Sequence, residues 1–199
     1  MIRTIQEPTT KIRNLPEDVT DWLFQYTYHG WPVLLLPSGE VLIANGVDIS
    51  WWRCFDRLRN ARIEVRHPIH CILCVEARDN KGNPSPTGPV RSLPALESGR
   101  RDAMLIVHDV AIRESVEVRA EVLRMLEYRS PFVKSLPFEL WDWPTVNISI
   151  EYALSQGYRG IVMKQGGSVY SSGPSEDWIE VCSEVSLGLS GPFVRGRKR

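Results

Sequence analysis

Two segments in the last quarter of the chain decide the fold that we expect: Gly157-Tyr158-Arg159-Gly160-Ile161-Val162-Met163-Lys164 and Trp178-Ile179-Glu180-Val181-Cys182. The first segment follows a stretch in which Ile150, Ala153 and Leu154 share one helical face. Asn147 is a suitable N-cap for this helix, and Gly157 provides the stop because glycine adopts the left-handed conformation that ends many helices. The pattern predicts a helix from about Asn147 to Gly157 that leads directly into a strand.

Upstream of these segments, apolar runs alternate with turn signals. The segments Pro37-Ser38-Gly39-Glu40 and Asn45-Gly46 contain residues that tolerate the backbone conformations of tight turns. Further strands are predicted over residues 69–76 and 104–110, where apolar side chains dominate. Residues 83–101 contain four prolines with several Gly and Ser, so we expect a long surface loop there.

Two other stretches have helical periodicity. One begins at Ser115, a suitable N-cap, and runs to about Tyr128, with a buried stripe predicted at Val118, Val122, Leu123 and Leu126. In the other, Trp51, Phe55 and Leu58 recur at helical spacing after Ser50. We expect these three side chains to form a core face, which is the commoner role of such a pattern.

The two segments quoted first resemble the last two nucleotide-binding motifs of ATP-dependent DNA ligases. In that family the first reads Gly-Tyr-Glu-Gly-x-Val-x-Lys, where the Glu serves the catalytic metal, and the second reads Trp-x-Lys-x-Lys, where the lysines hold phosphate. The three corresponding residues here are Arg159, Glu180 and Cys182. Arginine cannot ligate Mg²⁺, which needs oxygen ligands, and a carboxylate repels a triphosphate. Lys164 is retained, and as a lone lysine at a strand end it is expected to be solvated.

Earlier motif positions carry similar replacements. The nucleophile motif Lys-x-Asp-Gly of the family matches Thr27-Tyr28-His29-Gly30, so Thr27 stands where the lysine that carries AMP would be. A Thr hydroxyl attacks phosphate only with a base beside it, and His29 is the residue that would share its face of a strand. In this resemblance Ala44 replaces an arginine, Cys71 replaces a glutamate on the ribose side, and His108 replaces the phenylalanine that stacks on adenine.

The resemblance covers about Trp22 to Glu184 and implies an α+β nucleotidyltransferase (adenylation) domain, with antiparallel sheets packed together and flanked by helices. We expect residues 1–21 to form an N-terminal extension and residues 185–199 to form a basic C-terminal tail. The ligases continue into an oligonucleotide-binding-fold domain that closes over the nucleotide, and about 15 residues after Glu184 are too few for such a barrel. The resemblance therefore implies a scaffold that has lost its catalytic groups together.

The composition indicates a folded domain without a membrane segment. Its 199 residues include 24 basic and 24 acidic side chains, and this zero formal net charge gives no simple argument for general nucleic-acid binding. No apolar run is long enough to span a bilayer and the N-terminus lacks a signal-peptide core, so we expect a cytoplasmic protein. His67, His70, Cys71 and Cys74 are spaced like metal ligands, but a strand directs residues three apart to opposite faces. We therefore expect buried thiols instead of zinc.

Several residues are candidate contact sites for a partner. Trp141 and Trp143 lie in a predicted loop, where they either pack over an edge or anchor a partner. In the basic tail, Arg197 and Lys198 are either solvated or in contact with phosphate. Arg159 and Lys164 are added as candidates beside the former nucleotide cleft, and the loop over residues 83–101 is a further candidate surface.

We therefore expect a catalytically inactive, ligase-like binding module that needs no cofactor. A protein partner is favoured because the balanced charge offers no broad phosphate-binding field, and a phage-encoded modulator of a host protein would suit such a domain. One alternative is a nucleic-acid clamp that keeps the DNA-binding face of a ligase. The other is a divergent ligase or nucleotidyltransferase that uses ATP and Mg²⁺ with Lys11 or Lys164 as its nucleophile. The oligomeric state stays open.

Overall fold

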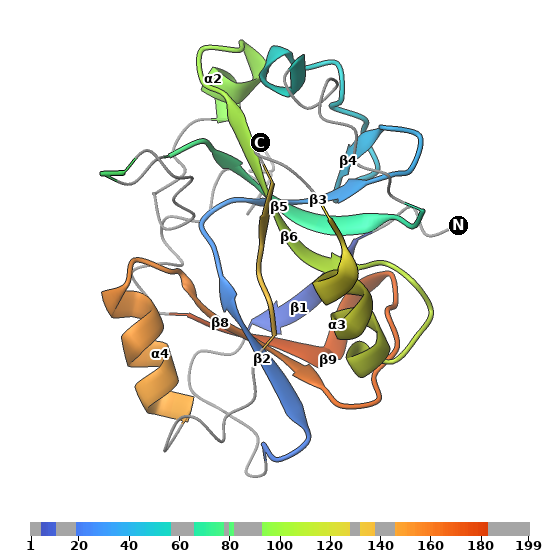
Figure 1. The fold of residues 1–199 in the computed structure, drawn as a ribbon, viewed down its shortest axis with the longest axis vertical. Coiled ribbons are helices and arrows are strands. Elements are labelled where there is room, and N and C mark those ends of the chain that lie inside the picture. The colour runs from blue at the N-terminus through green and yellow to red at the C-terminus, as the bar shows by residue number, and fades with distance from the viewer. Residues whose placement is uncertain are drawn as a thin grey trace, which may run out of the picture.

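A computed structural model describes residues 5–10, 19–56, 66–77, 80–81, 93–127, 132–137 and 146–182. These residues form two packed sheets flanked by helices (Figure 1), with strand orders β1-β9-β8-β2 and β4-β3-β5-β6-β7. The strands are β1 (Gln6–Thr10), β2 (Trp22–Thr27), β3 (Trp31–Leu35), β4 (Val41–Ile43), β5 (Ile69–Val75), β6 (Ala103–Val110), β7 (Phe132–Lys134), β8 (Gly160–Gln165) and β9 (Gly173–Cys182). The helices are the 3₁₀-helix η1 (Arg53–Phe55), α2 (Leu93–Glu97), α3 (Val116–Met125) and α4 (Val146–Ser155).

The α+β class is confirmed, but neither sheet is purely antiparallel. In the four-stranded sheet β1 runs parallel to β9, and in the five-stranded sheet β7 runs parallel to β6. We expected the domain to begin at Trp22, whereas β1 comes from the predicted N-terminal extension and adds an edge strand to the sheet. Ile5, just before β1, is 2% exposed and packs in the core with Trp178. This part of the extension is therefore built into the fold.

The predicted turns are present at both ends of β4. Gly39 has a φ of 89° and its N–H donates to the carbonyl of Leu36, which closes the β3–β4 hairpin. Gly46 has a φ of 79° and its N–H donates to the carbonyl of Ile43. Gly30, at the turn from β2 into β3, is needed for close approach: a Cβ there would lie 2.5 Å from the carbonyl oxygen of Leu73. The turn chemistry read from the sequence is confirmed.

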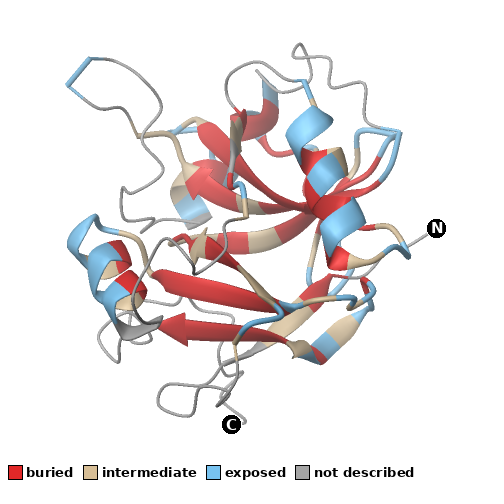
Figure 2. Ribbon diagram, turned by 60° about the horizontal axis from the view of Figure 1, so that its bottom comes forward, coloured by how far each residue is buried: buried red, intermediate tan, exposed pale blue. Residues whose placement is uncertain are grey.

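Helix α3 follows Ser115 as predicted, and within the expected stripe Leu123 is buried while Val122 and Leu126 pack against the same apolar cluster. Val118 is 45% exposed, so its predicted burial is wrong; the buried side chains of α3 are Val116, Arg119, Ala120 and Leu123. The helix has apolar residues on two faces, and the sequence period alone does not decide which face packs on β6. Figure 2 shows the exposed face of α3 pointing away from the sheets.

Three other local predictions need correction. Helix α4 begins at Val146, so Asn147 lies inside it and is not its N-cap, although Gly157 ends the helical segment with a φ of 85°. Residues 93–97 form α2 within the stretch predicted as a loop. Phe55 is buried as expected, but Trp51 is 64% exposed, so its assignment to the core is wrong; Leu58 lies outside the described residues.

Separate apolar clusters hold the layers together. The largest covers the outer face of the five-stranded sheet and joins it to η1, α2 and α3, while another joins the four-stranded sheet to α4 through Phe24, Ala153 and Met163. A third cluster, with Leu34, Leu36 and Trp178, lies between the two sheets. Among the described residues, no helix is both long and apolar enough to cross a membrane. The space between the sheets is where the candidate site lies.

Candidate functional site

A small cleft opens between the two sheets, beside β1. It is lined by Gln6, Glu7, Pro8, Thr27, Tyr28, Gly30, Pro32, His70, Ile72, His108, Arg159, Val162, Trp178 and Glu180. Thr27, His108, Arg159 and Glu180 are thus brought together from four separate motif positions, as the resemblance implied. The cavity volume is about 90 Å³, less than the roughly 150 Å³ of an engineered cavity that holds benzene. In this conformation the cleft holds a few waters or one small side chain.

Arg159 and Glu180 form an ion pair on the wall of this cleft. Arg159 Nη2 lies 3.2 Å from Glu180 Oε2, and the two side chains are 16% and 8% exposed. Glu180 lies on β9 opposite Val162, and Arg159 directly precedes β8, so its long side chain reaches Glu180 from just beyond the end of the strand. Arg159, at the position of the family's metal carboxylate, is therefore neutralised by Glu180, at the position of its first phosphate lysine.

Thr27 completes this cluster from β2. Its Oγ1 hydroxyl donates to Glu180 Oε1 over 2.9 Å. The proton that a nucleophilic Thr would give to His29 is thus engaged with a carboxylate, and His29 lies beyond the end of β2, where the backbone has left the strand. Cys182 is buried at the end of β9, and burial followed by the charge of Glu180 raises the pKa of its thiol, against the influence of Arg159. A thiol with a raised pKa stays protonated near pH 7, so Cys182 is not an activated nucleophile.

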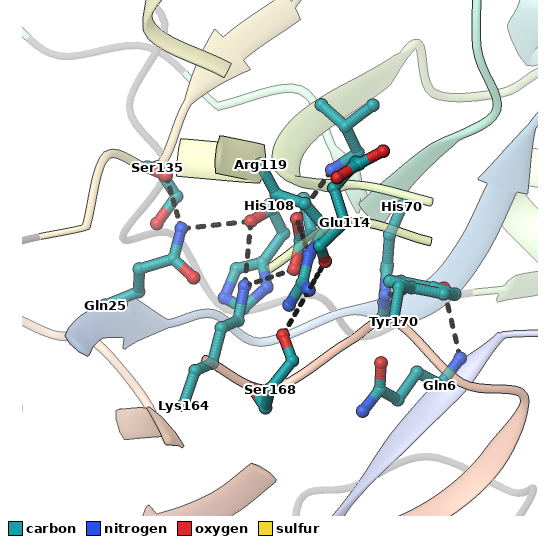
Figure 3. A network of polar contacts seen from close by, with 12 residues as sticks. Gln6, Gln25, His70, His108, Glu114, Arg119, Ser135, Lys164, Ser168 and Tyr170 are labelled. Carbon is teal, nitrogen blue, oxygen red and sulfur yellow. Dashed lines mark hydrogen bonds and ion pairs between the residues drawn. The ribbon is translucent and has the colours of Figure 1, made fainter. Parts of the chain in front are cut away.

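Lys164 is buried, so the prediction that it is solvated is wrong. Its side chain is 3% exposed, and its Nζ lies 2.9 Å from Asp109 Oδ2 and 3.2 Å from the carbonyl oxygen of His108 (Figure 3). The ammonium also lies 4.2 Å from the ring centroid of Trp178, a cation–π distance. Burial lowers the pKa of Lys164 to about 8, and the charge of Asp109 limits the drop. Lys164 does not line the cleft.

Asp109 is the centre of a buried network that joins both sheets to α3. Its Oδ1 accepts from Arg119 Nε at 3.1 Å and from the Val110 N–H at 2.7 Å. Arg119 is fully buried and also donates to the carbonyl oxygens of Glu114 and Ser168. Burial alone would raise the pKa of Asp109, but the charges of Lys164 and Arg119 hold it below its ordinary value. Two cations therefore share one carboxylate in the interior.

A second polar link crosses the same interface. Gln25 Nε2, on β2, donates to the carbonyl oxygens of His108 at 2.9 Å and Ser135 at 2.7 Å. Figure 3 shows the Gln25 and Lys164 side chains reaching from the four-stranded sheet toward the same carbonyl of β6. Because these buried donors are matched to specific acceptors, they fix how the two sheets lie relative to each other.

His108 is held inside the protein as part of an aromatic cluster. Its ring lies 6.3 Å from Trp178 and 5.9 Å from His70, and His70 stacks on Trp178 at 5.6 Å with an interplanar angle of 18°. Burial, and after it the charge of Lys164, hold the pKa of His108 well below its ordinary value. The nearby Tyr26 backbone acts in the opposite direction and raises this pKa, but by less. The same two causes lower the pKa of His70 to about 3. Both rings are therefore neutral near pH 7.

Other predicted site residues are not brought to the cleft. Cys71 is fully buried in the outer apolar cluster of its sheet, and Ala44 is exposed in the turn after β4. Cys74 packs in a different cluster from Cys71, as expected for residues three apart on a strand. Among the described residues, no group of three or more His, Cys, Asp or Glu is placed to hold a metal ion. Lys11, Trp141, Trp143, Arg197, Lys198 and the tail lie outside those residues.

Asp109, Arg119 and the contribution of β1 to the cleft wall were not predicted from the sequence. Asp109 had a detectable signal, since it directly follows the apolar run Met104–Val107 and His108, where a lone carboxylate is expected to need a partner. Arg119, the partner of Asp109, gave no sequence signal, because it lies on a helix whose buried face the sequence does not decide. Gln6, which is fully buried, gave no signal either.

No protein-family model matches the chain, and no curated protein is similar enough in sequence to match. Solved structures do match. They include a Lig E DNA ligase from a study of DNA binding with a minimal scaffold (TM-score 0.64, 16% identity, 92% of this chain and 70% of that one) and the Chlorella virus DNA ligase-adenylate (TM-score 0.64, 12% identity, 92% and 68%). The ligase domain of LigD from M. tuberculosis matches with a TM-score of 0.62 at 12% identity over 89% of this chain and 58% of that one.

The fold is that of a ligase-type nucleotidyltransferase domain. At this level of identity the likeness concerns the fold and nothing finer. The chain spans 58% to 70% of the length of the three solved chains named above. Its cleft is lined by four residues at positions that the resemblance assigns to nucleotide motifs: Thr27, His108, Arg159 and Glu180.

Proposed function

We propose that this ligase-type domain does not transfer adenylate and acts as a binding module for a protein partner. The observation that supports the proposal is the closed cluster of Arg159, Glu180 and Thr27 on the cleft wall. Each of these groups already has its partner inside the protein. A phage-encoded modulator of a host protein is the biological role that we propose for such a module, by analogy alone.

Electrostatics argues against the ligase reaction at this cluster. Adenylyl transfer depends on cations placed around the α-phosphate and on a metal held by oxygen ligands. Here Arg159 would repel Mg²⁺, and Glu180 would repel phosphate. Thr27 offers a hydroxyl where an amine is needed, and Lys164 is enclosed in an ion pair and does not line the cleft. These changes act on the same transferred group, so their effects combine. We propose that neither ATP nor Mg²⁺ is a cofactor.

A nucleic-acid clamp is the second candidate. It is favoured by the likeness to a Lig E structure whose study concerns DNA binding with a minimal scaffold. A clamp needs a field of unpaired cations along the phosphate path, whereas this chain has no net charge. A clamp also predicts affinity that falls steeply as salt rises, because phosphate contacts release counterions. A protein partner therefore remains our first proposal.

The test is covalent labelling. The purified protein is incubated with α-labelled ATP and Mg²⁺ or Mn²⁺, denatured and separated on a gel, beside a competent DNA ligase. We expect a labelled band for the ligase alone. A band for this chain would overturn the proposal, and loss of that band in K11A or K164A would identify the lysine that carries the label.

A further inference from the structure

Two contacting segments, one that contains η1 and one that follows α2, carry an exposed tryptophan and three exposed arginines, none of which lines the cleft. We name this set, Trp51, Arg53, Arg100 and Arg101, the Trp–Arg patch. Trp51 is 64% exposed, and all three arginines are exposed. Figure 1 shows α2 at the top of the view, beside the segment that contains η1, with α4 at the lower left.

The patch is held in place by backbone geometry. The indole N–H of Trp51 donates to the carbonyl oxygen of Asp48 over 3.1 Å, which fixes the ring. The Asp48 carboxylate accepts from the N–H groups of Ser50 and Val41, which fixes the turn that carries the ring. An aromatic anchor that is already fixed loses less side-chain entropy when a partner covers it.

The two elements that carry the arginines lie in direct contact. Gly99, just after α2, has a φ of 70°, and a Cβ there would lie 2.5 Å from Cβ of Arg53. The next two residues are Arg100 and Arg101. Among the residues that the structure describes, these three guanidinium groups form no ion pair. They are therefore available to anions that approach from outside.

We propose that the Trp–Arg patch is the docking surface for an acidic segment of the protein partner. This inference rests on the proposed function and adds a place and a chemistry to it. Trp and Arg are the side chains most enriched among the residues that dominate binding energy at protein interfaces. Carboxylates in the partner would pair with the guanidinium forks, while an apolar side chain covers the indole.

The neighbouring charges favour an acidic protein segment over nucleic acid. Glu97 is exposed at the end of α2, two residues before Gly99, so a carboxylate lies near the arginines. A phosphate backbone has one charge at every step and would meet this carboxylate, whereas the charges of a peptide can be spaced so that it avoids it. The zero net charge of the chain provides no long-range attraction for a polyanion.

The experiment is selection of peptides from a random library displayed on phage, against the immobilised full-length protein. Enriched peptides and a single-stranded oligo-dT are then measured by fluorescence polarisation. We expect the enriched peptides to carry net negative charge. We expect W51A and the triple variant R53E/R100E/R101E each to weaken their binding by more than about tenfold. M125A alters a residue that is 73% exposed on α3 and serves as the control that leaves affinity unchanged. Near-ultraviolet circular dichroism checks the fold of each variant.

The outcomes separate the patch from the proposed function. Peptides that bind W51A and the triple variant as tightly as the unaltered protein would overturn the patch and leave the protein-binding function standing. Enrichment of neutral or basic peptides would overturn the acidic chemistry. Tight binding of oligo-dT, lost in the triple variant, with no peptide enriched, would overturn both. If neither probe binds, the patch is not a docking surface of this kind.

Discussion

His108 makes the stability of this domain depend on pH below neutrality, and His108→Phe should reduce that dependence. In the folded protein, burial first and then the charge of Lys164 hold the pKa of the His108 ring well below its ordinary value. In the unfolded chain a histidine takes up a proton near pH 6.5. The unfolded state therefore binds more protons as the pH falls from 7 to 5. The free energy of unfolding must fall in the same direction.

The magnitude follows from that difference in protons. A histidine that stays neutral in the folded state over this interval and has a pKa of about 6.5 when unfolded lowers the free energy of unfolding by about 2 kcal/mol between pH 7 and pH 5. His70, whose folded pKa is lowered to about 3, contributes this amount. H108F removes the contribution of His108, so its loss of stability over this interval should be smaller than that of the unaltered protein, by at most about 2 kcal/mol.

Phenylalanine is the suitable replacement because it keeps an aromatic ring against Trp178 and His70. Neither ring nitrogen of His108 has a hydrogen-bond partner with good geometry, so the substitution removes no aligned hydrogen bond. The assay is urea denaturation of both proteins at pH 7 and pH 5. H67Q, at an exposed histidine, is the matched control for the loss of one histidine. An equal loss of stability in H108F and the unaltered protein would refute the reasoning, since it would mean that His108 takes up its proton when folded.

Three further predictions concern the contacts between strands. R159M should lower the free energy of unfolding by about 3 kcal/mol, because it leaves Glu180 without its cation. The double variant R159M/E180M should lose less stability than the sum of the two single variants, which a double-mutant cycle in urea measures. D109N should be more destabilising than K164M, because it leaves two buried cations without a carboxylate while K164M leaves one pair intact; thermal unfolding at pH 7 ranks them. G160A should lower the free energy of unfolding by more than about 2 kcal/mol, because a Cβ there would collide with the backbone of β9, and a variant of unchanged stability would contradict the β8–β9 register.

Local features of the fold were predictable because they depend on neighbours in sequence. The turns at Gly39 and Gly46 need a positive φ, and the helix stop at Gly157 needs the same conformation. Glycine adopts a positive φ readily, so the residue type alone indicates the local backbone conformation at these positions. The position of the cleft was also predictable, because the order and spacing of the motifs resemble those of a known family. The position of β1 in the sheet was not predictable, because β1 pairs with β9 and these strands are far apart in the chain.

The contacts that decide the chemistry of the site were not predictable in the same way. Lys164 has the sequence context of a solvated lysine, and only the arrival of Asp109 from the other sheet makes its burial possible. Trp51 has the spacing of a core residue, but the turn at Asp48 directs its ring outward. In both cases the deciding interaction is a single hydrogen bond or ion pair that no periodic pattern encodes.

The exchange of charge between Arg159 and Glu180 is best understood as one coupled change. Either replacement alone would leave like charges facing each other across the cleft wall, because a ligase has the opposite signs at these positions. Both together restore an ion pair, and Thr27 then has an acceptor where a lysine would instead compete with Arg159 for Glu180. We propose that a site whose charges are paired in this way keeps the packing of the sheets without holding a charged ligand. Selection on such a domain would then act on its outer surface, which supports a search for the partner at exposed anchors such as Trp51.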